Sequence, residues 1–160
     1  MDFRKSSVIR ELSDHMSVLF ASMDPVSWRK YWDAYIAMAD QFILLNECNM
    51  DLAQKKNHIH CFVGFYLVIN ILTTIHRDVQ DPPDGWVGML VFGDYRGGNR
   101  CIPDLGLALY YRPGDVVFMR SWALKHFITT YEGNQRYVIV FSTTRFIFNW
   151  FERQGSQTQS

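Results

Sequence analysis

Residues 73–78 of the chain are Thr-Thr-Ile-His-Arg-Asp, and they close an apolar, strand-like run that begins near Cys61. Residues two apart on an extended strand point to the same side, so His76 and Asp78 are expected to share one face. Two imidazoles and one carboxylate can hold a redox metal ion on one face and leave its other positions open. Because His-x-Asp is common by chance, the meaning of this stretch depends on later residues.

Two later residues complete the pattern. His126 lies in a second strand-like run, and Arg136 begins the apolar run 137–141. A hairpin turn at Glu132-Gly133-Asn134 would fold the strand of Arg136 back beside His126. An arginine on an apolar strand needs an anionic partner, and a guanidinium can fork onto the carboxylate of a small acid. The predicted site therefore has three metal ligands and one anion-binding arginine, deeper in the fold than the metal: His76, Asp78, His126 and Arg136.

The segment from Cys61 onward has the composition of a β-sheet protein. Short runs rich in Val, Ile, Phe and Tyr alternate with turn signals, which is typical of a sandwich or barrel. Strands are expected over 61–75, 86–92, 105–111, 115–120, 124–130, 136–142 and 145–151. Turns are expected at 81–85, 93–94, 97–99, 113–115 and 132–134. Gly97-Gly98 permits positive φ, Pro113-Gly114 favours a type II turn, and Asp115 can cap its amides.

Helices are expected before the strands, within residues 6–56. Ser6 or Ser7 can cap the first helix, and Asp24-Pro25 has the residues of an N-cap and a first helical turn. The aromatic stripe of the second helix favours packing on a sheet, with an aromatic ligand box as the alternative. Residues 46–57 are expected to form a loop or short helix. The pair His58-x-His60 is interpreted as two ordinary histidines, with metal ligation as the less favoured alternative.

Composition favours one folded domain. The chain has 160 residues, of which 48% are hydrophobic, and its formal net charge is zero. We expect a single domain over 1–153, with its β core at about 58–151, and a disordered tail over 154–160. No global basic excess points to nucleic acid. Three cysteines without a CxxC pair favour a reducing, intracellular compartment, and no apolar run is long enough to cross a membrane or to form a secretory signal.

The order His76-x-Asp78, His126 and Arg136 resembles that of the double-stranded β-helix family of Fe(II)/2-oxoglutarate dioxygenases. Four further segments, within roughly residues 60–145, resemble the ten-eleven-translocation/J-binding-protein (Tet/JBP-like) branch, especially its stand-alone fungal-type members. They are 93–98 (Gly-Asp-Tyr-Arg-Gly-Gly), 102–106 (Ile-Pro-Asp-Leu-Gly), 111–118 (Tyr-Arg-Pro-Gly-Asp-Val-Val-Phe) and 124–127 (Leu-Lys-His-Phe). The glycine and proline frame is shared more widely, including with prolyl hydroxylases. The resemblance implies a jelly-roll, cupin-like core after the N-terminal helices.

The resemblance also implies an activity. His76, Asp78 and His126 would hold Fe(II), 2-oxoglutarate would chelate this ion, and Arg136 would bind the far carboxylate of 2-oxoglutarate. With O₂, the co-substrate would be converted to succinate and CO₂ while a C–H bond is hydroxylated. Asn70 is a candidate partner for the inner carboxylate of 2-oxoglutarate. The favoured alternative for Asn70 is a structural one, in which its side chain satisfies backbone groups near a bulge.

The substrate is less closely constrained. The branch resemblance implies the methyl group of a modified nucleobase, such as 5-methylcytosine in DNA, which must be flipped into the pocket. DNA or RNA would need a cationic rim, and the localisation would then be nuclear. A protein side-chain or small-molecule hydroxylase and a non-catalytic β-helix binding module are the alternatives. The candidate rim residues, between which acidic residues are interspersed, are Arg77, Arg96, Arg100, Arg112, Arg120 and Lys125.

Overall fold

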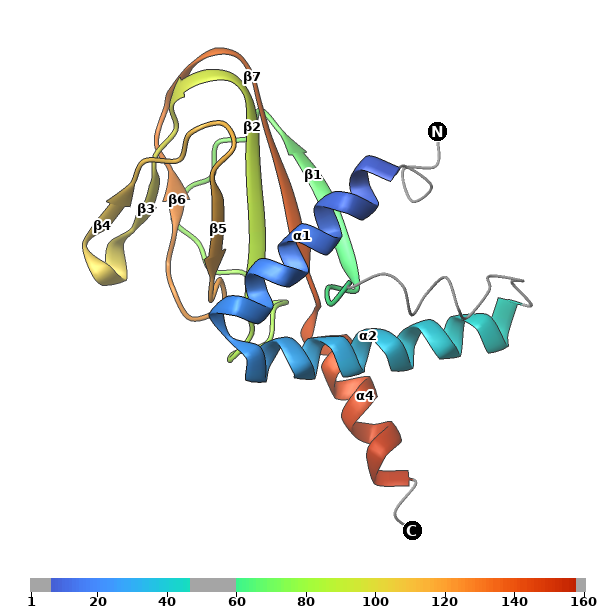
Figure 1. The fold of residues 1–160 in the computed structure, drawn as a ribbon. Coiled ribbons are helices and arrows are strands. Elements are labelled where there is room, and N and C mark those ends of the chain that lie inside the picture. The colour runs from blue at the N-terminus through green and yellow to red at the C-terminus, as the bar shows by residue number, and fades with distance from the viewer. Residues whose placement is uncertain (1–6, 47–59, 158–160) are drawn as a thin grey trace. The chain divides into compact units, whose positions relative to one another are not determined.

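The structure, a computed structural model, describes residues 7–46 and 60–157. The described chain is a mixed fold of helices and antiparallel sheets, as Figure 1 shows. The described residues form two compact units, one from 7–46 and 60–63 with 146–157, and the other from 64–145. The prediction of helices before the strands is confirmed. A single functional domain over 1–153 stays a prediction.

The helical unit contains α1 (Ser7–Met23) and α2 (Pro25–Asn46). The predicted cap is confirmed, because the backbone N–H of Ser27 donates to Asp24 Oδ1 at 3.0 Å and Pro25 is the first residue of α2. The indole N–H of Trp28 donates to Ser17 Oγ at 2.8 Å, so this member of the predicted aromatic stripe helps to join α1 to α2.

Aromatic rings form the core of the helical unit. The ring of Tyr31 lies 5.2 Å from that of Phe20 and 4.8 Å from that of Phe148, in edge-to-face arrangements. His60 is a structural residue of this unit, because its Nδ1 lies 3.1 Å from Asp14 Oδ1. His58 and most of the predicted loop 46–57 lie outside the described residues.

The prediction of a strand over 145–151 is wrong, because Arg145–Gln157 forms helix α4. The aromatic composition of this run favours a strand, but its burial does not alternate. Ile147 and Phe148 are both buried while Phe146 is 68% exposed, which is one face of a helix. The predicted disordered tail is also wrong as far as residue 157, where α4 ends. Residues 158–160 lie outside the described part of the chain.

The β unit contains two antiparallel sheets (Figure 1). The four-stranded sheet has the order β1-β7-β2-β5, and the three-stranded sheet has the order β4-β3-β6. The strands are β1 (Gly64–Ile69), β2 (Val87–Gly97), β3 (Arg100–Ile102), β4 (Leu107–Leu109), β5 (Val116–Met119), β6 (Phe127–Ile128) and β7 (Tyr131–Ser142), with a 3₁₀ turn η2 (Pro103–Leu105) between β3 and β4.

Three predicted turns of the β unit are confirmed. In the turn predicted at 81–85, the N–H of Gly85 donates to the carbonyl of Pro82 at 2.9 Å. Gly97 and Gly98 have φ of 82° and 66° where β2 leads to β3. Pro113-Gly114 forms the third turn, with φ of 93° at Gly114 and a hydrogen bond of 2.9 Å from the N–H of Asp115 to the carbonyl of Arg112. Asp115 Oδ2 also accepts from the N–H of Arg112 at 2.7 Å, so the predicted cap is present.

Two other predicted turns are wrong. Gly93-Asp94 lies inside β2, and Glu132-Gly133-Asn134 lies inside β7. The two strands pair along their length, with a shift of register between Asp94 and Tyr95. Gly93 and Gly133 have positive φ and lie so close to the facing backbone that a Cβ would collide with it. These glycines therefore allow the close approach of the two strands at a β-bulge. The connection that precedes β7 consists of residues 129–130, which follow β6.

The predicted strand 61–75 is shorter than expected, because β1 ends at Ile69. His76 and Asp78 consequently lie in the irregular connection between β1 and β2, and not on a regular strand. Among the described residues, no helix is long and apolar enough to cross a membrane. Cys61 and Cys101 are free thiols, and Cys48 lies outside the described residues.

Candidate metal centre

The backbones of His76 and His126 hold the two histidines together. The N–H of His76 donates to the carbonyl of His126 at 3.1 Å, and the N–H of His126 donates back at 3.0 Å. This isolated antiparallel bridge brings the two ring centroids within 4.3 Å. Two segments far apart in sequence thus meet at the pair of residues that the sequence analysis selected.

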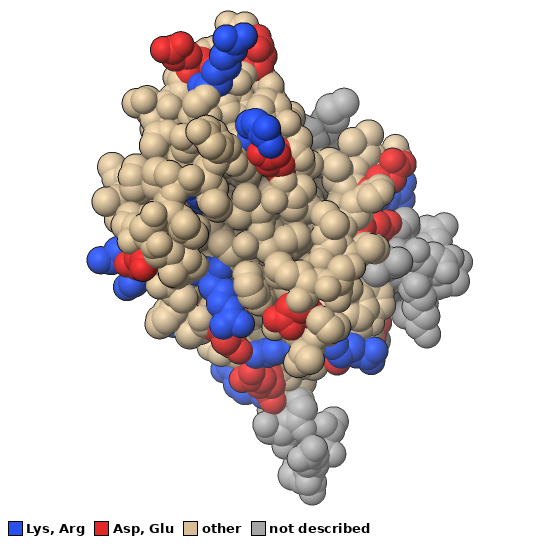
Figure 2. Space-filling model, turned by 60° about the vertical axis from the view of Figure 1, so that its left-hand side comes forward, with Lys and Arg blue, Asp and Glu red and all other residues tan. Residues whose placement is uncertain are grey.

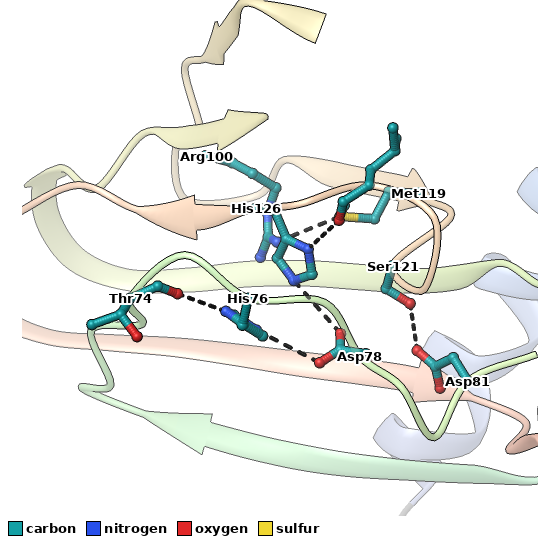
Figure 3. A network of polar contacts seen from close by, with 9 residues as sticks. Thr74, His76, Asp78, Asp81, Arg100, Met119, Ser121 and His126 are labelled. Carbon is teal, nitrogen blue, oxygen red and sulfur yellow. Dashed lines mark hydrogen bonds and ion pairs between the residues drawn. The ribbon is translucent and has the colours of Figure 1, made fainter. Parts of the chain in front are cut away.

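Asp78 faces both imidazoles. Its Oδ1 lies 3.6 Å from Nε2 of His76 and its Oδ2 lies 3.5 Å from Nε2 of His126, as Figure 3 shows. The other ring nitrogens have separate partners, because Nδ1 of His76 lies 2.7 Å from the carbonyl of Thr74 and Nδ1 of His126 lies 3.0 Å from that of Leu124. A carbonyl only accepts, so each Nδ1 carries the proton. The lone pair of each neutral ring is then at Nε2, the atom that faces Asp78.

These three side chains fit a metal ion. One ligand atom from each of His76, Asp78 and His126 lies within 4.8 Å of the other two. Ligand atoms on one face of an octahedral ion with bonds of about 2.1 Å lie about 3 Å apart. Small rotations of the side chains would therefore bring the donors onto an ion. The donor set of two imidazoles and one carboxylate suits a non-haem ferrous ion with open positions.

Burial prepares His126 for this role. Its side chain is 5% exposed, and burial lowers its pKa below the ordinary 6.5. The nearby charge of Arg100 acts in the same direction, while the carboxylate of Asp78 opposes it. A lowered pKa keeps the imidazole neutral near pH 7, and only the neutral ring offers a lone pair to a metal.

Hydrogen bonds to Ser121 and to Asp104 hold the segment that carries Asp78. The N–H of Asp78 donates to the carbonyl of Ser121 at 3.1 Å, and the Ser121 hydroxyl donates to the buried carboxylate of Asp81.

Asp104 forms a second link, because its Oδ2 accepts from the N–H of Lys125 at 2.7 Å and from Nη2 of Arg77 at 3.3 Å. Arg77 lies between two ligands in sequence and Lys125 precedes the third. Asp104 thus ties both ligand-bearing segments to the 3₁₀ turn η2.

The three residues open onto a cavity of about 240 Å³. Both sheets supply its walls, since Val68, Met89, Val138 and Val140 come from the four-stranded sheet while Arg100 and Ile128 come from the three-stranded one. A largely apolar wall excludes water and strengthens the electrostatic interactions of the few polar groups inside.

Arg136 also lines this cavity, but the predicted hairpin does not bring it there, because residues 132–134 lie inside β7. Its side chain is 2% exposed, and its guanidinium carbon lies 5.4–5.8 Å from the ring centroids of Tyr95, Tyr111 and Tyr131. Its Nε and Nη2 have no hydrogen-bond partner among the described residues. A Cβ at position 98 would lie 3.3 Å from Nε, so Gly98 leaves room for the guanidinium.

Neither any protein-family model nor any curated protein sequence matches this chain.

Asn70 has a structural contact. Its Oδ1 accepts from the N–H of Arg136 at 2.7 Å, and its own N–H donates to the carbonyl of Arg136 at 2.9 Å. Its φ of 53° lies in the left-handed region, which asparagine tolerates. The favoured structural role is thus confirmed. Asn70 is not among the described residues that line the cavity. Its contact with a co-substrate stays a prediction.

The predicted cationic rim needs a correction. Arg100 is 5% exposed and lines the cavity, so it is not a rim residue. Arg77 pairs with Asp104, Arg112 lies 3.6 Å from Asp115, and Arg120 lies over the ring of Trp86 at 4.9 Å. On the face drawn in Figure 2, basic side chains are scattered, several of them beside acidic ones, across a largely uncharged surface. That face carries no continuous basic band.

Arg100 is the residue of the cavity whose role sequence reasoning missed. It follows Gly97-Gly98-Asn99, so it has the context of an exposed turn residue. A weak signal was present in the alternation of β3, where Arg100 and Ile102 share the buried face on either side of the half-buried Cys101.

Proposed function

We propose that this protein is an Fe(II)- and 2-oxoglutarate-dependent dioxygenase that hydroxylates a C–H bond. The observation that carries the proposal is the convergence of His76, Asp78 and His126 on one cavity. This cavity also contains the guanidinium of Arg136, whose Nε and Nη2 have no hydrogen-bond partner among the described residues. A facial metal site next to a buried arginine suits a ligand that chelates the metal at one end and carries a carboxylate at the other.

The proposal extends to the fold. We infer that the β unit is a double-stranded β-helix, or jelly roll, in which the site lies between two antiparallel sheets. The support for this inference is that strands of both sheets line the same cavity, including Val138 of β7 and Ile128 of β6. The confirmed turns at Gly97-Gly98 and Pro113-Gly114 belong to the motif frame on which the resemblance rests.

Each residue has a defined task in this proposal. His76 and His126 present Nε2 to the ion, and the backbone carbonyls on their Nδ1 atoms fix the ring orientation. Asp78 supplies the anionic ligand. Arg136 binds the distal carboxylate of the co-substrate, and the apolar walls keep water away from the reacting groups. The bound iron and 2-oxoglutarate supply the oxidising chemistry when O₂ is present.

The test of this class is the release of succinate from 2-oxoglutarate. Succinate should form only when Fe(II) and O₂ are present, and His76→Ala should abolish it. His15→Ala, at an exposed histidine of α1, is the matched control and should retain the wild-type rate. Turnover in His76→Ala would contradict the metal assignment. Complete absence of turnover and of Fe(II) binding in the wild type would favour a non-catalytic binding module.

The narrower proposal is that the substrate is a methylated nucleobase, such as 5-methylcytosine. Tyr66 supports it, because this ring lines the cavity and is 50% exposed, which suits stacking of a flipped base. The cationic residues support it less, since Arg77 and Arg112 pair with aspartates and Arg100 is buried. Grip on a nucleic acid would then need another domain or partner.

The substrate test compares methylated DNA and RNA oligonucleotides with peptide pools under identical turnover conditions. An oxidised methyl group on the base, detected by mass spectrometry, is the expected result. Tyr66→Ala should slow this oxidation while the succinate released without substrate stays unchanged. Oxidation confined to peptides would replace the nucleobase proposal by a protein hydroxylase.

A further inference from the structure

Arg100 is a buried cation that the site described so far does not use. Its side chain is 5% exposed and lines the cavity, and in Figure 3 it reaches in beside His126. Its Nη1 lies 3.5 Å from Met119 Sδ, which is a weak acceptor, and its Nε has no hydrogen-bond partner. Among the described residues, Arg100 forms no ion pair.

The guanidinium groups of Arg100 and Arg136 both lie against one ring, that of Tyr111. The distances to its centroid are 5.2 Å from Arg100 and 5.4 Å from Arg136. The Tyr111 hydroxyl is buried and also lacks a hydrogen-bond partner. Polar atoms of three neighbouring buried side chains therefore lack hydrogen-bond partners among the described residues, and a ligand could supply those partners.

The charges of the cavity do not balance. Arg100 and Arg136 both line the cavity, and both are buried cations. Asp78 is the only carboxylate among the described lining residues, and it faces the two histidines. A divalent ion on Asp78 would add further positive charge. A buried, unpaired charge is costly, so two of them beside a cation site indicate that an anionic ligand belongs there.

We propose that Arg100 and Arg136 together form a dianion site, which selects a small molecule with two acidic groups and binds it even without metal. Arg136 takes the acidic group farther from the histidines, and Arg100 takes the one beside His126. The identity of the natural ligand rests on the proposed function, under which it is 2-oxoglutarate and Arg100 holds the carboxylate at the metal end. The site itself can be tested separately from that function.

The alternative is that Arg100 has a structural role through Tyr111 and Met119. Stability separates the two roles. If Arg100 is there for a ligand, replacing it by methionine removes an unpaired buried charge and should leave the ligand-free protein equally or more stable. If Arg100 is structural, the same substitution should lower the unfolding temperature of the ligand-free protein.

The experiment measures binding by isothermal titration calorimetry to the full chain after passage over a chelating resin. The probes are glutarate, with two carboxylates, and pentanoate, which has the same carbon count and one carboxylate. Wild type should bind glutarate at least about 10-fold more tightly than pentanoate, because a second charge-assisted pair is made. 2-Oxoglutarate should bind without metal as well.

Substitutions then locate the site. Arg100→Met and Arg136→Met should each weaken glutarate binding by about 10- to 100-fold, whereas Arg96→Met, at an exposed arginine of β2, should not. Arg100→Lys keeps the charge without the planar fork, so it should bind glutarate with intermediate affinity. This variant replaces Arg100→Met in the binding test if the methionine variant does not fold.

The proposal is overturned if metal-free wild type does not prefer glutarate, or if neither Arg100→Met nor Arg100→Lys changes that preference. It is also overturned if the ligand-free methionine variant loses stability while its preference stays intact. None of these readouts needs iron or turnover. A protein that binds diacids but neither binds Fe(II) nor releases succinate would keep the dianion site and refute the dioxygenase.

Discussion

His76 and His126 are backbone partners, since each donates its N–H to the carbonyl of the other, at 3.1 Å and 3.0 Å. The backbones that carry the two rings are therefore held together by main-chain hydrogen bonds, and their separation does not depend on side-chain packing alone. Under the proposed function, a site held in this way would be formed before an ion binds, which would reduce the cost of ordering the ligands on binding.

Asp104 should act on metal affinity from outside the coordination sphere. Asp104→Ala removes the acceptor for the N–H of Lys125 and for Arg77, so the ligand-bearing segments on both sides of the ion lose one link. Metal affinity should fall about 10-fold, which calorimetric titration with Mn²⁺ would measure. Asp115→Ala is the matched control, because Asp115 also accepts a backbone N–H at 2.7 Å and lies near an arginine, but is not tied to the ligands. Equal losses in both variants would contradict a positioning role.

Asn70 distinguishes a backbone role from contact with the co-substrate. Asn70→Ala removes the acceptor for the N–H of Arg136 and places alanine at positive φ, so unfolding free energy should fall by about 1 to 2 kcal/mol. Asn70→Asp keeps the acceptor oxygen and tolerates the same backbone, so its stability should be close to that of wild type. The KM for 2-oxoglutarate should also stay unchanged in Asn70→Asp. A large rise in that KM would instead place the side chain against the inner carboxylate.

Arg136 should control co-substrate affinity more than the rate at saturation. Arg136→Lys keeps a cation but loses the planar fork that can bind a carboxylate through two hydrogen bonds. We expect the KM for 2-oxoglutarate to rise about 10-fold or more while Fe(II) affinity is retained. Steady-state succinate release at varied 2-oxoglutarate gives both parameters. An unchanged KM would remove Arg136 from the carboxylate site.

His126 should make the metal-free protein sensitive to acid. Burial lowers its pKa below 6.5, so the unfolded chain binds a proton more readily than the folded one. The stability that depends on a neutral His126 is complete above pH 6.5 and is lost as the pH falls through the lowered pKa of the folded state. His126→Gln cannot titrate, so its unfolding free energy should depend less steeply on pH between about 7 and 5. Denaturant titrations at several pH values measure this slope, and identical slopes would contradict the assignment.

Local chemistry explains which turns were predictable. Pro113, Gly114 and Asp115 carry the φ preference and the side-chain acceptor that a capped type II turn requires, so that turn could be inferred without knowledge of the fold. Gly93 and Gly133 also have positive φ, but each is needed because the backbone of the facing strand passes close to it at a bulge. The need for glycine there comes from a partner some forty residues away, and a local pattern assigns it wrongly to a turn.

The candidate site was predictable to the extent that its residues are chemically unusual. Two histidines, a carboxylate and an arginine on an apolar strand are conspicuous in sequence, and the structure brings all four to one cavity. The structural reason for the position of Arg136 differs from the prediction. Arg136 is positioned by the pairing of β7 with β2 and β1, and not by the expected hairpin at 132–134. The sequence predicts Arg100 at the rim, because it lies directly after the turn at 97–99. Its burial depends on the pairing of β3 with β6, which is non-local.

The central claim is that His76, Asp78 and His126 share one metal ion. Its most direct test is an anomalous difference map from a crystal of the full chain soaked anaerobically with Fe(II). We predict one strong peak at about 2.0–2.3 Å from Nε2 of His76, Nε2 of His126 and a carboxylate oxygen of Asp78, and no peak there in His126→Ala. No peak at these residues in the wild type, or a strong peak elsewhere, would contradict the account.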